Sequence, residues 1–97
     1  MEFEFFAPAQ AELTQVVDYY NQQQDGLGEE FASEVFKAIH RILEQPHAWG
    51  KLSRRCRRCR TNRFPYGVVY QVREKCILII AVMHLHRRPE YWMERLR

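Results

Sequence analysis

Two histidines, an arginine and a tyrosine near the end of the chain could together carry out acid–base chemistry on a phosphate ester. His84 and His86 alternate at the end of an apolar run, so they share one face if that run is a strand. Cleavage of RNA needs a base, an acid and positive charge at the phosphate; imidazole suits the first two roles and guanidinium the third. A bland alternative stays open, in which His84 is a packing residue and the arginines beside it bind a protein. The predicted catalytic residues are His84, His86, Arg87 and Tyr91.

An arginine-dense segment, residues 54–63, offers a surface that could hold a polyanion. If this segment is a strand, Arg58 and Arg60 share one face, and Arg55, Arg57 and Arg63 share the other. Guanidinium groups suit phosphate because they bind two oxygens at once. The alternative is a charged edge strand that discourages pairing between sheets. The predicted nucleic-acid-binding residues are Arg55, Arg57, Arg58, Arg60, Arg63 and Arg88.

The pair Cys56 and Cys59 has the spacing of half a zinc site. A structural zinc ion needs four ligands, and two residues three apart on a strand point to opposite faces. We therefore predict no metal and no cofactor. The odd number of cysteines, three, leaves at least one thiol free and favours a reducing compartment.

The elements that must position these residues follow from periodicity and from helix-breaking residues. Residues 2–5 alternate between polar and apolar and predict a short first strand. Two amphipathic helices follow, the first from Ala7 to the segment 21–26 and the second from Leu27 to Gln45, where Pro46 ends it. Runs of β-branched and aromatic residues then predict a three-strand antiparallel meander within residues 54–83, and residues 90–96 predict a short helix. We expect one α+β domain over residues 1–97, with the helical hairpin packed on the sheet.

Charge is distributed unevenly along the chain. The formal net charge is only +3, but nine of the fifteen Lys and Arg residues lie between Lys51 and Lys75, where Glu74 is the only acid. Such a one-sided field favours nucleic acid or an acidic protein as partner, although a solvated basic strand would look the same. The start of the chain lacks the pattern of a signal peptide, and the longest apolar run, residues 76–83, is too short to span a bilayer. We expect a cytoplasmic protein that does not enter a membrane.

Taken together, the sequence resembles the toxins of RelE/ParE-type toxin–antitoxin pairs. The resemblance covers essentially the whole chain and rests on the order of elements and on a set of short motifs. These are Tyr19-Tyr20, Leu27-Gly28 before Phe31, Pro46, Arg63-Phe64-Pro65-Tyr66, Val69-Tyr70, and Arg88-Pro89 followed by Tyr91-Trp92. The resemblance implies a compact α+β toxin in a hetero-oligomer with a small acidic antitoxin.

The resemblance also implies one of two activities. One branch of these toxins cuts messenger RNA on the ribosome without metal, and Arg58, Arg60 and Tyr91 match basic and tyrosine positions of that branch. Two positions depart from it, because Gly67 and Leu85 stand where basic residues are usual. The other branch poisons DNA gyrase by binding, without nuclease chemistry. We expect ribosome-dependent mRNA cleavage, with gyrase poisoning as the alternative.

Overall fold

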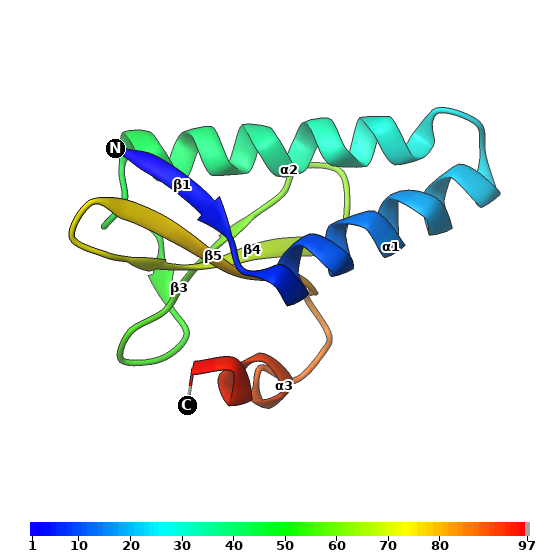
Figure 1. Cartoon of the computed structure of the whole chain (residues 1–97). Coiled ribbons are helices and arrows are strands. Elements are labelled where there is room, and N and C mark those ends of the chain that lie inside the picture. Colours follow the sequence, from blue (N-terminus) through cyan, green and yellow to red (C-terminus); the bar gives the residue numbers. More distant parts are fainter. Residues whose placement is uncertain (97) are drawn as a thin grey trace.

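Within residues 1–96, which the computed structural model describes, five strands form one sheet between a helical hairpin and a short C-terminal helix (Figure 1). This arrangement confirms the predicted α+β fold, including the N-terminal strand, the hairpin, the meander and the last helix. The elements are β1 (Glu2–Phe5), α1 (Ala7–Gln23), α2 (Leu27–Glu44), β2 (Gly50–Lys51), β3 (Arg57–Arg60), β4 (Tyr66–Val72), β5 (Cys76–His84), α3 (Glu90–Met93) and the 3₁₀ helix η1 (Glu94–Leu96).

The sheet has the strand order β1-β5-β4-β3-β2. Strand β1 runs parallel to β5, and the other neighbouring strands are antiparallel. The sequence did not predict β2; in the structure Gly50 and Lys51 pair with β3. The predicted strand at residues 54–63 is shorter, because the backbone turns at Cys56, whose carbonyl accepts from two N–H groups, and at Arg63, whose φ is +72°.

The turn between α1 and α2 depends on two glycines. Gly26 has a φ of +84°, a conformation that costs an L side chain about 1–2 kcal/mol. Gly28 lies in the first turn of α2, close to α1, and a Cβ at this position would collide with the backbone oxygen of Val17. The backbone N–H of Gly28 also donates to Oδ1 of Asn21 at 2.7 Å. This close approach holds the two helices together as one antiparallel hairpin.

Two apolar layers cover the two faces of the sheet. On one face, Phe31, Val35 and Ile39 of α2 pack with residues of β4 and β5 in the larger core. On the other face, Trp92 of α3 is fully buried beside Met83. The hairpin and α3 thus lie on opposite sides of the sheet, as Figure 1 shows. No helix within residues 1–96 has the length and apolar character needed to cross a membrane.

Candidate functional site

The two histidines lie close together at the end of β5. The rings of His84 and Tyr66 meet edge to face with their centroids 5.2 Å apart. The centroid of the His86 ring lies 5.4 Å from that of the His84 ring. The backbone N–H of His86 donates to Nδ1 of His84 at 3.1 Å. Because that nitrogen accepts, the neutral imidazole of His84 carries its proton on Nε2. Tyr66 packs against the core beneath the helical hairpin, so His84 lies on the hairpin side of the sheet.

Tyr91 is sandwiched rather than exposed. The guanidinium of Arg87 lies 3.6 Å from the centre of the Tyr91 ring, and that of Arg95 lies 5.1 Å from it. The phenol oxygen is buried and lies near the Glu12 carboxylate. Burial, and then the charge of the nearby Glu12 carboxylate, raise the pKa of Tyr91 well above its ordinary value. At neutral pH the phenol is therefore protonated and cannot serve as a base.

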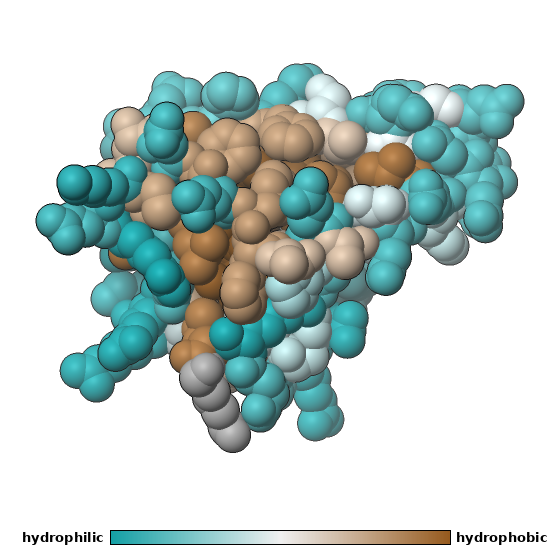
Figure 2. Space-filling view, in the orientation of Figure 1, coloured by the Kyte–Doolittle hydropathy of each residue, from teal (hydrophilic) through white to brown (hydrophobic). Residues whose placement is uncertain are grey.

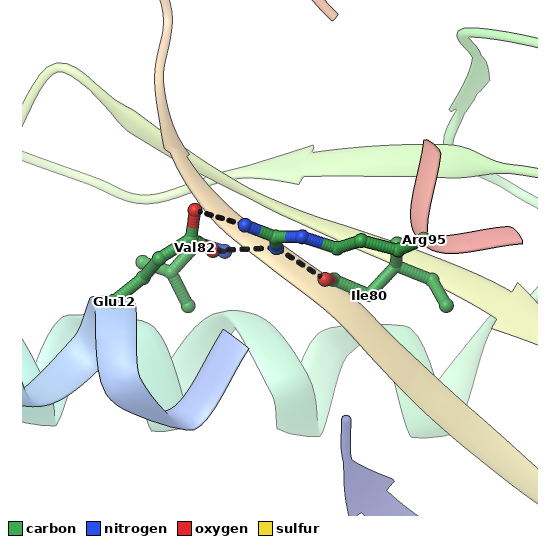
Figure 3. Close-up of polar contacts among 4 residues, drawn as sticks. All are labelled: Glu12, Ile80, Val82 and Arg95. Carbon is green, nitrogen blue, oxygen red and sulfur yellow. Dashed lines mark hydrogen bonds and ion pairs between the residues drawn. The ribbon is translucent and has the colours of Figure 1, made fainter. Parts of the chain in front are cut away.

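A clasp between Glu12 and Arg95 fixes the C-terminal segment beside this site (Figure 3). Both oxygens of the Glu12 carboxylate accept from the Arg95 guanidinium, at 3.0 and 2.9 Å. The same two side chains complete the edge of β5, where pairing with β1 ends at Ile79. Beyond that point the N–H of Val82 donates to Glu12 at 3.0 Å, and the carbonyl of Ile80 accepts from Arg95 at 2.9 Å. The clasp therefore takes the place of a missing stretch of strand.

Three of the four predicted catalytic residues line one small pocket of about 110 Å³. They are His84, Arg87 and Tyr91, and the carboxylate of Glu12 lies in the same lining. His86 contacts His84 but does not line the pocket. The structure thus brings most of the predicted set together, although an acidic residue and a protonated phenol lie among them.

Arg58 of β3 lies on the other side of the sheet from His84. A Cβ on Gly67 would lie 2.7 Å from Cδ of Arg58 and 3.3 Å from a methyl of Leu85, so these three residues share one face. Gly67 follows Tyr66 directly in β4, and successive residues of a strand point to opposite faces. Arg58 therefore lies on the α3 side, where its stem fills the space that a larger residue at position 67 would take. The structure does not bring Arg58 together with the His84 imidazole.

The remaining predicted binding residues have different surroundings. Arg57 donates to the backbone oxygen of Trp49 at 2.8 Å. Arg63 is ion-paired with Glu30 at 2.6 Å, so part of its charge is already compensated. Arg55 is exposed in the loop before β3, and Arg88 is exposed beyond β5. These arginines thus do not form one continuous row.

A hollow at the β2–β3 edge of the sheet has a volume of about 500 Å³ and is strongly basic. We call it the basic cleft; its lining residues are Arg41, Trp49, Gly50, Lys51, Leu52, Arg58, Arg60 and Asn62. Of these residues, Arg58 and Arg60 were predicted from the sequence to bind nucleic acid, whereas Arg41, Trp49 and Lys51 were not. Lys51 could have been predicted, because it is the first residue of the basic stretch that ends at Lys75. Arg41 lies outside that stretch, in the preceding helix.

The two central cysteines lie on opposite faces of the sheet, as strand alternation predicted. Cys59 is buried in the core on the hairpin side and Cys56 in the core on the α3 side. Burial raises the pKa of both thiols. They are thus protonated packing residues at neutral pH.

Comparison with known proteins points to one family. The family model that describes the ParE toxin of the type II toxin–antitoxin system parDE matches residues 3–89. Among solved structures, the chromosomal ParDE system from P. aeruginosa is similar with a TM-score of 0.77 and 16% sequence identity. The alignment covers 87% of this chain and 95% of that chain. No curated protein matches the sequence. At that identity, the structural likeness concerns the fold.

Proposed function

Since this chain belongs to the ParE toxin family of type II toxin–antitoxin systems, we propose that it arrests growth by binding and poisoning DNA gyrase, without nuclease chemistry. The sequence resemblance to RelE/ParE toxins predicted this membership, and the family match confirms it. The choice of gyrase over messenger RNA rests on the geometry of the residues that cleavage would need.

One observation carries the proposal: the His84 imidazole and the guanidinium of Arg58, a position that matches the mRNA-cleaving branch, lie on different faces of the sheet. His84 packs on the hairpin side, whereas Arg58 lies on the α3 side beside Gly67 and Leu85. A single phosphate cannot contact groups that a layer of sheet separates. The proposal is also supported by Tyr91, whose buried phenol keeps its proton at neutral pH.

Ribosome-dependent mRNA cleavage is the second candidate, favoured by the small pocket at the end of β5. There His84 could act as base or acid, Arg87 could stabilise the phosphorane, and Tyr91 could orient a base of the RNA. No metal would be needed, because arginine supplies the positive charge. His86 would act as the second acid–base group beside His84.

We propose in addition that a small acidic antitoxin binds this chain and forms a hetero-oligomer with it. Two surfaces support such a partner. The basic cleft would attract its carboxylates. Figure 2 shows a hydrophobic area over β1 and the adjacent part of α2, where Phe3, Phe5 and the 39% exposed Phe36 form a cluster with ring centroids 6.0 to 6.4 Å apart. An acidic, amphipathic segment that folds on binding would match both.

Two assays on one set of variants test the proposed target. Purified protein should inhibit supercoiling by gyrase and stabilise broken plasmid DNA. The triple variant His84→Gln, His86→Gln, Tyr91→Phe should retain this activity and still arrest growth, because it keeps polar rings or amides in place and removes only acid–base groups. Tyr91→Phe preserves the ring on which Arg87 stacks.

The opposite result would favour the second candidate. If gyrase is unaffected at molar excess of the protein, and the triple variant loses both toxicity and cutting of mRNA on ribosomes, the gyrase proposal is wrong. A circular dichroism melt of the triple variant is the control, since loss of folding would also abolish toxicity.

A further inference from the structure

We propose that the β2–β3 edge of the sheet binds the phosphate backbone of a nucleic-acid strand. This inference rests on the basic cleft and goes beyond the proposed target. A second hollow of about 260 Å³ adjoins the cleft, and Lys51 lines both. The second hollow adds His47, Arg54, Arg55, Cys56, Arg57, Gln71 and Val72 to the lining. Neither lining contains an aspartate or glutamate, so the path carries a one-sided positive charge.

Backbone carbonyls position two cations of this path, Arg41 and Arg57. Arg41 donates to the carbonyl of Arg60 at 2.8 Å, and Arg57 donates to the carbonyl of Trp49 at 2.8 Å. The indole N–H of Trp49 in turn donates to the carbonyl of Arg41 at 3.4 Å. Carbonyl acceptors orient a guanidinium but leave its charge in place. The cations of the ion pairs Lys37–Glu34, Arg63–Glu30 and Arg95–Glu12 all lie outside the lining of the basic cleft.

Crowding of like charges indicates that an anion would stabilise this surface. Burial, and then the neighbouring charge of Arg60, lower the pKa of Arg58. A phosphate between these two guanidinium groups would remove their mutual repulsion and replace lost water contacts. Such an anion need not disturb the fold, because the side chains of Lys51 and Arg60 are already exposed.

The shape of the path favours a polymer over a single ion or side chain. The larger hollow has the volume of a typical small-ligand pocket, enough for a nucleotide, and Trp49 offers an aromatic surface in its lining. The path then continues past Lys51 into the second hollow. A chain of phosphates can occupy both hollows, whereas one phosphate or one carboxylate occupies only part of one.

This site would hold nucleic acid without cutting it. The lining of the basic cleft contains no histidine, tyrosine or acid, and the second hollow adds a single histidine, His47, with no tyrosine or carboxylate in its lining to act as its acid–base partner. Binding here is therefore compatible with a toxin that contacts the DNA held by its target, and it does not depend on the pocket around His84.

Fluorescence anisotropy with labelled oligonucleotides tests the inference on the purified full chain. Single-stranded DNA and RNA of ~20 nucleotides would be titrated at several salt concentrations between about 50 and 200 mM. The double variant Lys51→Gln/Arg60→Gln removes two exposed cations of the path. We expect it to weaken binding at least about tenfold and to reduce the slope of log K against log salt by about 1.4, near 0.7 for each lost phosphate contact.

The matched control is Lys37→Gln/Lys75→Gln, which removes the same charge outside both hollows. We expect the control to bind within about twofold of wild type. An equal loss of affinity in both double variants would reduce the effect to net charge and overturn the inference. Absence of oligonucleotide binding at low salt would also overturn the inference. Tighter binding of a polyglutamate peptide than of the oligonucleotides, lost in the Lys51→Gln/Arg60→Gln variant, would overturn it as well. Because gyrase is absent from this assay, its failure is distinct from failure of the proposed target.

Discussion

The clasp between Glu12 and Arg95 allows a quantitative prediction about the stability of the fold. Replacing Glu12 with alanine removes the acceptor of the Val82 N–H and leaves the Arg95 guanidinium without its counter-charge. An orphaned buried N–H costs roughly 1–3 kcal/mol. Breaking a fully buried ion pair costs roughly 3–5 kcal/mol, but the side chains of Arg95 and Glu12 are 16% and 14% exposed, which lowers that contribution to about 2 kcal/mol.

We therefore expect Glu12→Ala to lower the free energy of unfolding by about 3–4 kcal/mol, a large part of the roughly 5–10 kcal/mol typical of a chain this size. The melting temperature should fall by about 15–20 °C. Glu12→Gln keeps an oxygen for Val82 but loses the charge, so we expect about half the effect. Urea denaturation followed by tryptophan fluorescence and circular dichroism would measure all three proteins.

A double-mutant cycle isolates the clasp from other effects of these substitutions. In Glu12→Ala/Arg95→Ala the second change removes a cation that the first has already left unpaired. We expect a coupling free energy of about 2 kcal/mol between the two positions. If the two single effects add to within about 0.5 kcal/mol, the clasp does not act as a unit and the reasoning is refuted.

Three further predictions concern other parts of the fold. Tyr70 is buried, its hydroxyl donates to the backbone oxygen of Pro46, and burial raises its pKa from 10.0 to about 12. Between pH 10 and pH 12 the unfolded state therefore loses the phenol proton while the folded state keeps it. The free energy of unfolding should fall over this range as the pH rises, by up to about 2.7 kcal/mol. Tyr70→Phe should cost about 1 kcal/mol at pH 7 and flatten this decline, as thermal melts from pH 7 to 12 would reveal. Gly28→Ala should lower the free energy of unfolding by more than about 2 kcal/mol, because the new Cβ would collide with the backbone of α1. Gly26→Ala should lower it by about 1–2 kcal/mol, because an L side chain is strained at this positive φ. Equal losses of stability in denaturant titrations would contradict this difference. Thr61→Val removes a buried hydroxyl that bonds two carbonyls and should cost about 1–2 kcal/mol in chemical denaturation, while Thr61→Ser should retain most of that stability.

The order and type of the main elements could be predicted because local signals mark them. Pro46 ends the second helix, Gly26 permits the turn between the helices, and the runs at residues 68–70 and 76–83 have the composition of buried strands. The short strand β2 could not be predicted, because two residues carry no periodicity and pair only where β3 lies beside them. The family resemblance rested on the same local motifs and was confirmed by the family match.

The candidate site was predictable only where its residues are neighbours in sequence. His84, Arg87 and Tyr91 lie within one short segment and line one pocket, although their catalytic roles stay predictions. Arg41 joins the basic cleft from the last turn of α2, and nothing in its local sequence indicates this. The sequence analysis gave no role to Glu12, yet its carboxylate bonds a residue 83 positions away.

By itself, the sequence determined which segments are helix or strand, where positive charge accumulates, and that Cys56 and Cys59 point apart. Those properties depend on each residue and its near neighbours, through backbone preference and side-chain period. Only the tertiary structure decided that His84 and Arg58 face opposite sides of the sheet, that Arg41 and Lys51 share a cleft, and that Glu12 and Arg95 complete the edge of β5. These outcomes depend on which strands become neighbours and where β1 stops, and packing of the whole chain sets both.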